Sequence, residues 1–571
     1  MNRELSKIFR EISVLLEIKG VPFKPQAYER VAYAVDSLEE GLADTYKDGG
    51  LKALEEIPGV GKSIAEKIEE YIKTGRVKEY DKLKKEFPVD IESLRSVEGV
   101  GPKMILKLYK KLGIKNLDQL EKAAKARKIR NVEGLGQKTE EKIIKGIGFL
   151  KSSGGRLILG FSMPTAKILL EKIRKIPKVK SAEFAGSLRR RKETIGDLDF
   201  IVFSEKPTAV INKFLKFPEI KHVYSQGPHK ALVRLSMDFD ADIAVVSPKS
   251  LGSALIAWTG DKNHNIALRT LAEKKGLLLN DYGLWRDKKL LVSRTEEEVY
   301  KKLGMDWVPP EMRNDSGEIE AALGHKLPNL IGCRDLKGDL QVQTDWTDGE
   351  HSIEQMAEAA MKQGLEYICI TDHTKSLAMT DGSDEKKLLK QVMAIDEANR
   401  KFKNLKFKIL KGAEVNIMKD GSLDINDETL AKLDVVGAAV HSLFNLSEEE
   451  QTKRIIKAME NPNVDIIFHP TGRIINRREP YKVNVEELLK AAKRTKTVME
   501  IDAFPDRLDL KDEYIRKGVE MGVKFSIDSD AHSTHHFPYL EYGVAQARRG
   551  WAEAKDIINT SSWQEMLRVL K

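Results

Sequence analysis

Residues 186–199 read GSLRRRKETIGDLD, and this stretch decides the fold around it. The mixed apolar and polar run before it, residues 179–185, predicts a short strand, and Phe200–Phe203 predicts a second, buried strand. Because alternate side chains of a strand point to the same face, Asp197 and Asp199 are expected to project together. Like charges held side by side repel, so little favours this arrangement unless cations lie between the two carboxylates.

Two further features would complete a site for metal ions and a triphosphate: the Gly-Ser pair that begins the stretch and a third acidic residue. Gly186 and Ser187 leave backbone N–H groups free at the mouth of a basic turn, which suits an anion such as a triphosphate. Asp242 is the preferred third acid because hydrophobic residues follow it, and Asp238 and Asp240 are its competitors. These features indicate nucleotidyl transfer. A solvated Asp-x-Asp pair at a strand end is the alternative interpretation.

The same residues carry a resemblance to a known family. The stretch is similar to the nucleotidyltransferase signature of the family X DNA polymerases, the family of DNA polymerase beta, and Asp242 matches that family's third acid. The resemblance implies that Asp197 and Asp199 bind both metal ions, Mg²⁺ or Mn²⁺, and that Asp242 binds the catalytic one. It also implies that the incoming triphosphate is held by Gly186, Ser187, Arg190 and Gly196.

A later segment resembles the nucleotide-binding turn of the same family. Residues 257–265 read AWTGDKNHN, and in the family an aromatic-Thr-Gly element packs under the sugar while an Asn contacts the base. The resemblance assigns nucleotide binding to Trp258, Thr259, Gly260 and Asn265. The family usually has two aromatic residues before Thr-Gly, but Ala257 stands at the first position here, which leaves Trp258 alone to exclude ribose.

Length and composition bound the class of protein. The chain has 571 residues, enough for roughly three to five domains of ~100–200 residues each, and no apolar run approaches the ~20 residues that span a bilayer. The net charge of +9 is compatible with a polyanionic partner. With only two cysteines, Cys333 and Cys369, and no signal peptide, we expect a cytoplasmic protein without disulfides. A monomer is our working assumption.

The N-terminal 150 residues contain an internal repeat. Residues 57–65 read IPGVGKSIA, residues 97–104 read VEGVGPKM, and residues 132–139 give a looser copy, VEGLGQKT. A Gly-x-Gly turn before a helix presents N–H groups to a phosphate, and the copies resemble helix-hairpin-helix motifs, which grip DNA backbones. A tight turn between helices is the alternative interpretation. We expect DNA contacts at Gly59, Gly61, Gly99, Gly101 and Lys103.

One lysine in this region has a second interpretation. The helix after the first repeat resembles the segment that carries the deoxyribose-phosphate lyase lysine of DNA polymerase beta, which makes Lys67 a candidate Schiff-base nucleophile. Ala27-Tyr28 resembles an Ala-Tyr pair that supports that site. A solvated or phosphate-contacting Lys67 is the alternative interpretation.

After residue 336, short apolar strands alternate with charged helices, which predicts a parallel barrel with its active-site loops at the carboxyl ends of the strands. His and carboxylate residues follow successive strands, a pattern that suits a cluster of zinc, manganese or iron ions. A packing role is the alternative for any single His. The candidate ligands are Asp348, Asp372, His373, Glu414, His441, His469, Asp530 and His532.

This region resembles a polymerase-and-histidinol-phosphatase (PHP) domain, through motifs such as His469-Pro470-Thr471-Gly472-Arg473 and Asp530-Ala531-His532. The family commonly begins with Asp-x-His-x-His, but Gln341 and Gln343 replace both histidines here. Because an amide oxygen is a poor ligand for Zn²⁺ or Mn²⁺, one metal position should be weak or vacant and nuclease activity reduced or lost.

We therefore expect a multi-domain α and α/β protein: a helical helix-hairpin-helix region, a mixed-sheet nucleotidyltransferase palm and a distorted (β/α) barrel of PHP type. Its leading function is gap-filling DNA synthesis on gapped or primer-template DNA with deoxynucleoside triphosphates. The rival is a metal-dependent 3′–5′ exonuclease or phosphoesterase whose N-terminal half mainly binds DNA. The expected boundaries are 1–80 (lyase-like), 81–150 (DNA-binding), 151–247 (palm), 248–320 (nucleotide-binding), 321–335 (linker) and 336–571 (PHP).

Overall fold

The computed structural model describes residues 2–22, 24–37, 41–57, 59–95, 97, 99–152, 156–236, 239–377 and 380–570. The chain divides into two compact units. The first contains Met1–Leu157, Phe161–Ile168 and Ile475–Arg478. The second contains Ile158–Gly160, Leu169–Ile474 and Glu479–Lys571. Residues 153–155, at the start of the expected palm region, and the competitor Asp238 lie outside the described residues. Among the residues described, no helix combines the length and apolar character needed to cross a membrane.

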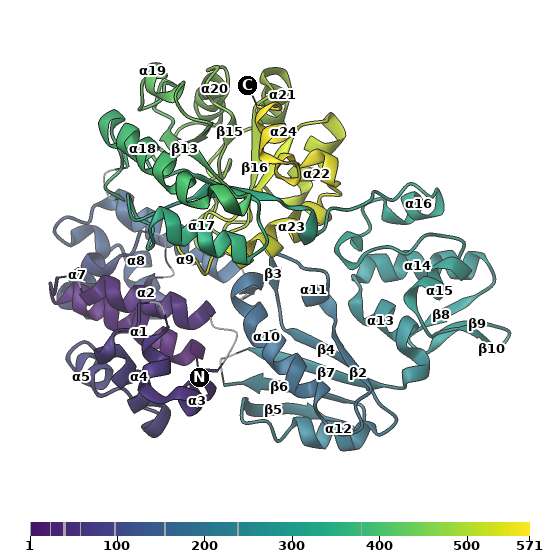
Figure 1. Cartoon of the computed structure of the whole chain (residues 1–571). Coiled ribbons are helices and arrows are strands. Elements are labelled where there is room, and N and C mark those ends of the chain that lie inside the picture. The colour runs from purple at the N-terminus through teal and green to yellow at the C-terminus, as the bar shows by residue number, and fades with distance from the viewer. Residues whose placement is uncertain are drawn as a thin grey trace. The chain divides into compact units, whose positions relative to one another are not determined.

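The first unit is helical, as predicted (Figure 1). Its three Gly-x-Gly turns share one geometry. Gly59, Gly99 and Gly134 have φ of 77°, 80° and 78°, a conformation that favours glycine. In each turn the next residue donates its N–H to the carbonyl three positions earlier, at 2.8 to 3.0 Å. The looser third copy is therefore a full structural repeat. Pro58 and Glu98 of these turns lie outside the described residues.

The helices of this region are α1 (Asn2–Ile18), α2 (Lys24–Ser37), α3 (Leu42–Glu55), α4 (Lys62–Thr74), α5 (Lys78–Glu86), α6 (Ile91–Arg95), α7 (Pro102–Leu112), α8 (Leu117–Lys125), η1 (Ile129–Asn131) and α9 (Gln137–Ser152).

The palm is built on a mixed five-stranded sheet in the order β2-β4-β7-β6-β5, counted over its described residues. Strand β4 is the centre of the core because every side chain of Phe200–Phe203 is fully buried. It pairs antiparallel with β2 and parallel with β7. The two strands predicted around the opening stretch are confirmed, although β2 is shorter than the predicted range.

The palm elements are β1 (Leu157–Ile158), α10 (Leu159–Arg174), β2 (Ser181–Phe184), α11 (Gly186–Arg189), β3 (Thr194–Ile195), β4 (Leu198–Phe203), α12 (Pro207–Phe214), β5 (Ile220–Gln226), β6 (Lys230–Leu235), β7 (Asp240–Val246) and η2 (Pro248–Ser250). The next segment contains α13 (Leu251–Thr259), α14 (Lys262–Lys274), β8 (Leu278–Asn280), β9 (Gly283–Arg286), β10 (Lys289–Val292), α15 (Glu296–Lys302), η3 (Pro310–Met312) and α16 (Glu318–Leu323).

In the C-terminal region, the described residues form a parallel seven-stranded sheet in simple chain order, β11 to β17, with helices between the strands (Figure 1). The first and last strands also meet: Gln343 N–H donates to the Ala531 carbonyl at 2.8 Å, and Leu340 N–H donates to the Asp528 carboxylate at 2.8 Å. The sheet is thus a nearly closed barrel, which confirms the predicted distorted (β/α) architecture.

The elements here are η4 (Cys333–Asp335), β11 (Gly338–Val342), α17 (Ile353–Lys362), β12 (Tyr367–Ile370), α18 (Glu385–Phe402), η6 (Lys403–Leu405), β13 (Lys408–Asn416), α19 (Asp427–Leu430), β14 (Val435–Ala439), α20 (Glu448–Met459), β15 (Ile466–Ile467), α21 (Val485–Thr495), β16 (Val498–Asp502), α22 (Asp512–Met521), β17 (Phe525–Asp528), η7 (Phe537–Tyr539), α23 (Leu540–Arg549), η8 (Ala554–Asp556), η9 (Ile558–Thr560) and α24 (Trp563–Leu567).

Candidate functional site

Three acidic side chains converge in the palm. The parallel register of β4 and β7 places Asp199 directly opposite Asp242, and Asp197 stands one residue before β4 begins. Burial, followed by the negative charges of Asp197 and Asp242, raises the pKa of Asp199 to about 7. The pKa of Asp242 is also raised, chiefly by burial. Three carboxylates in mutual repulsion are the donor set that divalent cations require, so these residues fit a metal pair.

Only a glycine at position 186 lets the backbone lie this close to the Asp199 carboxylate. A Cβ atom at Gly186 would lie 1.7 Å from Asp199 Oδ2, and the residue has φ of +53°. Only glycine therefore allows helix α11 to begin against the acid. Gly186 and Ser187 lie in that short helix, and Gly196 is exposed immediately before Asp197.

A cavity of about 410 Å³ brings together the other predicted nucleotide contacts. Its lining includes Arg190, Trp258, Thr259, Gly260 and Asn265. The Arg190 guanidinium donates to the Thr259 carbonyl, and Asn265 Nδ2 donates to the Ala257 carbonyl at 2.8 Å. Burial lowers the pKa of Arg190, and the negative charges of Asp261 and Asp199 act against that effect, so the cavity lies beside at least one of the three acids.

Two features of this region were not found by sequence reasoning. The buried Glu296 carboxylate pairs with Arg189 at 2.8 Å and with Arg313 at 2.7 Å, and this ion triad holds the basic turn against α15. The ammonium of Lys230 lies 4.1 Å from the centroid of the Trp258 ring, a cation–π contact. Both involve partners far apart in the sequence.

In the first unit, Lys67 lies close to an acidic and an aromatic side chain. Its Nζ lies 3.3 Å from Glu79 Oε2 and 6.0 Å from the centroid of the Tyr28 ring. The Tyr28 hydroxyl donates to the same Glu79 at 2.7 Å, and burial together with that carboxylate raises the pKa of Tyr28. Only 17% of the Lys67 side chain is exposed. Tyr28 and Lys67, paired by sequence resemblance, thus lie together.

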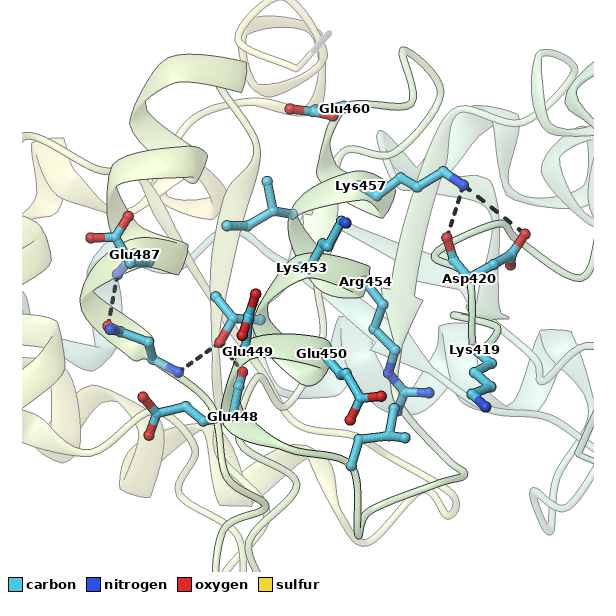
Figure 2. Close-up of a pocket in the computed structure, with 14 residues that line it drawn as sticks. Lys419, Asp420, Glu448, Glu449, Glu450, Lys453, Arg454, Lys457, Glu460 and Glu487 are labelled. Atoms are coloured by element: carbon cyan, nitrogen blue, oxygen red, sulfur yellow. Dashed lines mark hydrogen bonds and ion pairs between the residues drawn. The ribbon is translucent and has the colours of Figure 1, made fainter.

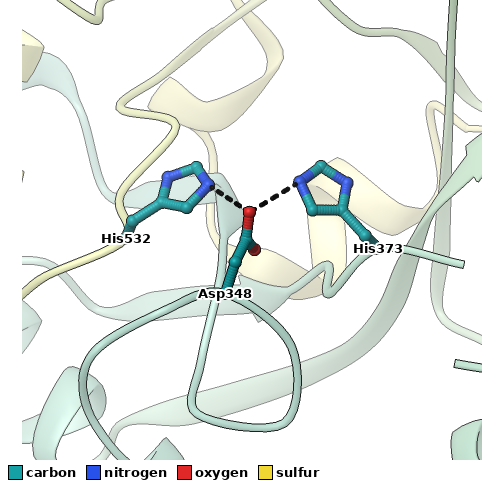
Figure 3. Close-up of side chains that lie close together, drawn as sticks. All are labelled: Asp348, His373 and His532. Carbon is teal, nitrogen blue, oxygen red and sulfur yellow. Dashed lines mark ion pairs between the residues drawn. The ribbon is translucent and has the colours of Figure 1, made fainter. Parts of the chain in front are cut away.

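In the barrel, candidate ligands meet at the carboxyl ends of the strands. Asp348 Oδ2 lies 3.6 Å from His373 Nε2 and 3.7 Å from His532 Nε2 (Figure 3). One donor atom from each of these three residues lies within 4.8 Å of the others, close enough to share one metal ion. The donor set fits Zn²⁺ or Mn²⁺.

The fully buried Glu414 is the centre of a second group. Its Oε1 lies 3.0 Å from His441 Nε2 and 2.8 Å from His469 Nε2. Its Oε2 instead accepts hydrogen bonds from the side-chain amides of Gln341 and Gln343, each at 3.0 Å. The two residues that depart from the family pattern therefore direct N–H groups toward the carboxylate.

Two acids lie beside these groups with other partners. Asp372, a candidate ligand from sequence, accepts hydrogen bonds from Thr344, Thr347 and Gln391, so it anchors the loop that leads to Asp348. Asp530 lies 3.4 Å from Arg507, an arginine that sequence reasoning missed.

Comparisons with known proteins agree with this arrangement. Four family descriptions match: helix-hairpin-helix domain at residues 1–77, SAM-like helix-hairpin-helix tandem at 91–148, DNA polymerase beta thumb at 254–314 and PHP domain at 339–559. Over 574 aligned residues, 100% of this chain and 99% of the relative, the chain is 35% identical to the DNA polymerase/3′-5′ exonuclease PolX of Bacillus subtilis (strain 168).

The chain belongs to the family X DNA polymerases that carry a PHP domain. It is also 37% identical over 219 residues to a probable phosphatase of Thermoanaerobacter sp. (strain X514), covering 37% of this chain and 84% of that one. DNA polymerase lambda of Arabidopsis thaliana is 24% identical over 55% of this chain and 62% of its own length. A ternary complex of Leishmania infantum polymerase beta is 25% identical, with TM-score 0.27, over 39% of this chain and 97% of that one.

A further pocket of this family X polymerase lies away from the candidate ligands. It has a volume of about 920 Å³ and carries both acidic and basic side chains around α20 (Figure 2). Lys457 and Asp420 pair across one side of it at 4.0 Å. None of the predicted site residues lines this pocket, so it does not enter the assignment of the active sites.

We predict that Asp199→Asn stabilises the metal-free polymerase. The folded-state pKa of Asp199, about 7 against an ordinary 3.8, means that burial of the ionised carboxylate, together with repulsion from Asp197 and Asp242, lowers the free energy of unfolding as pH rises from about 4 to about 7. At pH 8 in EDTA, thermal unfolding of the variant should show a gain of roughly 1–2 kcal/mol, and below pH 4 no gain. The exposed Glu205→Gln is the control. Equal stability at pH 8 would contradict the repulsion.

Proposed function

We propose that this chain is a DNA-directed DNA polymerase that fills short gaps in DNA repair by two-metal nucleotidyl transfer. The observation that carries the proposal is the meeting of Asp197, Asp199 and Asp242 beside the cavity of Arg190 and Trp258. Bound Mg²⁺, or Mn²⁺, would lower the barrier for attack of a primer 3′-hydroxyl on the α-phosphate of a deoxynucleoside triphosphate.

The chain's own residues supply binding and orientation. Asp197 and Asp199 would hold both ions, and Asp242 the ion nearer the primer. Arg190 would exchange the Thr259 carbonyl for a phosphate oxygen, since a charged acceptor binds a guanidinium more strongly than a neutral carbonyl. The remaining nucleotide contacts are proposed for Gly186, Ser187, Gly196, Trp258, Thr259, Gly260 and Asn265.

The Gly-x-Gly turns would hold gapped or primer-template DNA through its phosphates. Gly59 and Gly99 are exposed at the turns, and α4 and α7 begin directly after Gly61 and Gly101. The first N–H groups of a helix have no partner within the helix and suit phosphate oxygens. Lys103, exposed in the first turn of α7, would add charge without reading bases.

A second activity, deoxyribose-phosphate lyase, is favoured by the surroundings of Lys67. An amine must lose its proton before it attacks a sugar aldehyde, and the Glu79 carboxylate lies 3.3 Å from Lys67 Nζ, where it can accept that proton. The Tyr28 hydroxyl donates to the same carboxylate and would hold it in place.

For the PHP domain we propose a metal-dependent 3′-end phosphoesterase of reduced activity. Asp348, His373 and His532 would hold one ion. Glu414 and His441 would hold another, with His469 beside one oxygen of that carboxylate and His373 beside the other, while Gln341 and Gln343 would weaken the centre. The rival assignment makes this activity the main one. The identity of each ion, a monomeric state, a cytoplasmic location and the domain boundaries stay predictions.

Asp242→Ala should abolish primer extension while leaving DNA binding almost unchanged. Loss of one metal-binding carboxylate should slow addition at least about 1,000-fold, equal to about 4 kcal/mol of barrier. The measurement is lengthening of a labelled one-nucleotide-gapped duplex, with magnesium or manganese and with or without nucleotides. Asp240→Asn, on the same strand but paired with Arg234 at 2.9 Å, is the control. Primer extension at the wild-type rate by Asp242→Ala would show that Asp242 does not hold the catalytic ion. Shortening of the labelled strand in the absence of nucleotides would favour the exonuclease or phosphoesterase assignment.

Lys103→Ala should weaken binding of gapped duplexes of every sequence to a similar degree. Because one phosphate contact is lost, the slope of log affinity against log salt should become shallower by about 1. Titrations by fluorescence anisotropy across several salt concentrations measure this slope. Lys110→Ala, exposed in the last turn of the same helix, should leave the slope unchanged. An unchanged slope for Lys103→Ala would place DNA elsewhere.

Lys67→Ala should lose borohydride-trapped crosslinks to a 5′-deoxyribose-phosphate end, because the Schiff base forms on that amine. The crosslink is scored by gel shift on a labelled strand. Lys73→Ala, on the same helix with 57% of its side chain exposed, is the matched control and should crosslink normally. Undiminished trapping by Lys67→Ala would leave Lys67 as a phosphate-contacting or solvated residue.

A further inference from the structure

The PHP centre contains a fixed cation supplied by the chain. Arg507 Nε lies 3.4 Å from Asp530 Oδ2 and 3.5 Å from Asp502 Oδ2, and 22% of its side chain is exposed. Asp502 is fully buried and Asp530 nearly so. Two buried carboxylates beside each other need a positive charge, and a guanidinium cannot lose its charge in a protein.

The geometry of the chain directs Arg507 inward. Strand β16 ends at Asp502, whose Oδ1 accepts the Phe504 N–H at 2.7 Å, and Arg507 N–H donates to the Phe504 carbonyl at 2.9 Å. This turn brings the guanidinium back over the end of the strand. Burial, followed by the charge of Arg507, lowers the pKa of His469, so the arginine lies near the Glu414 group.

Two glutamine side chains add further hydrogen-bond donors to the same centre. Gln341 and Gln343 both donate to Glu414 Oε2, which also lies 3.5 Å from His373 Nδ1, whereas the other oxygen, Oε1, pairs with His441 and His469. An ion bound by Asp530 would lie about 2.0–2.6 Å from its oxygen, next to a guanidinium that already contacts that oxygen. Repulsion between the two cations at such distances would be severe.

We infer that the PHP domain of this chain binds two divalent ions, and that Arg507 with the amides of Gln341 and Gln343 takes the place of a third. One ion belongs to Asp348, His373 and His532, and the other to Glu414 and His441, with His469 beside the same carboxylate. In each group a hydrogen bond fixes one imidazole with Nε2 toward the ion: His532 Nδ1 lies 2.8 Å from the Asp530 carbonyl, and His441 Nδ1 lies 2.8 Å from Asn416 Oδ1. The inference rests on the metal-binding role proposed above for the domain.

Metal stoichiometry tests the inference. The full chain carrying Asp197→Asn and Asp199→Asn, which silence the palm, is dialysed against Mn²⁺, and bound metal is counted by mass spectrometry. Two ions per chain are expected, falling to one in His441→Ala and in His532→Ala. Three ions would overturn the inference while leaving the metal-binding role intact. No bound ion would overturn the metal-binding role as well.

Removing the protein groups that take the place of the third ion gives a second test. Gln341→His, Gln343→His and Arg507→Ala together should raise the stoichiometry from two to three, with folding checked by circular dichroism. Arg507→Met alone should lower the melting temperature in EDTA and enlarge the stabilisation that Mn²⁺ gives, because Asp502 and Asp530 then lack a cation. Arg494→Met, which removes an exposed arginine paired with Glu460 at 2.8 Å, is the matched control. Equal metal-induced stabilisation in Arg507→Met and Arg494→Met would overturn the role of Arg507.

Discussion

Repulsion among three carboxylates is the constraint on which the polymerase half depends. The register of β4 with β7 sets Asp199 opposite Asp242, and the buried run Phe200–Phe203 anchors that register in the core. A slip of one residue would turn every one of these side chains to the other face of the sheet. Apolar burial therefore offsets an arrangement that electrostatics opposes, and a cation pair bound there would convert the repulsion into affinity.

The PHP domain resolves a similar crowding of acids in another way. Asp502 and Asp530 have the permanent charge of Arg507 beside them, and Glu414 has two amides on one oxygen and two imidazoles near the other. Much of the negative charge is thus compensated by the protein itself. In the palm, the charges of Arg190 and Lys230 offset the crowding of acids only in part, since the pKa values of Asp199 and Asp242 stay raised, and the two sites should consequently differ in how strongly their folded state depends on metal.

Local patterns predicted most of what the structure contains, and long-range pairs account for what they missed. Asp242 was selected because an apolar run follows it, and most of the barrel candidates because they follow short apolar runs, although Glu414 lies inside strand β13. Their roles as ligands stay predictions. Arg507 and Glu296 gave no such signal: Glu296 meets Arg189 across 107 positions, and Arg507 follows its strand among ordinary loop residues. A charged residue looks solvated in a sequence until the fold supplies its partner.

Lys230 connects the three acids of the palm with Trp258 of the neighbouring cavity. Its ammonium stacks 4.1 Å from the Trp258 ring centroid, and the same charge partly offsets the burial that raises the pKa of Asp242. Since Ala257 leaves Trp258 without a neighbouring aromatic residue, the lysine supplies packing and charge on the face of that ring. Because Lys230 acts on both, movement of the Trp258 ring would alter the field at Asp242, and we expect nucleotide binding in the neighbouring cavity and metal binding at the three acids to be coupled.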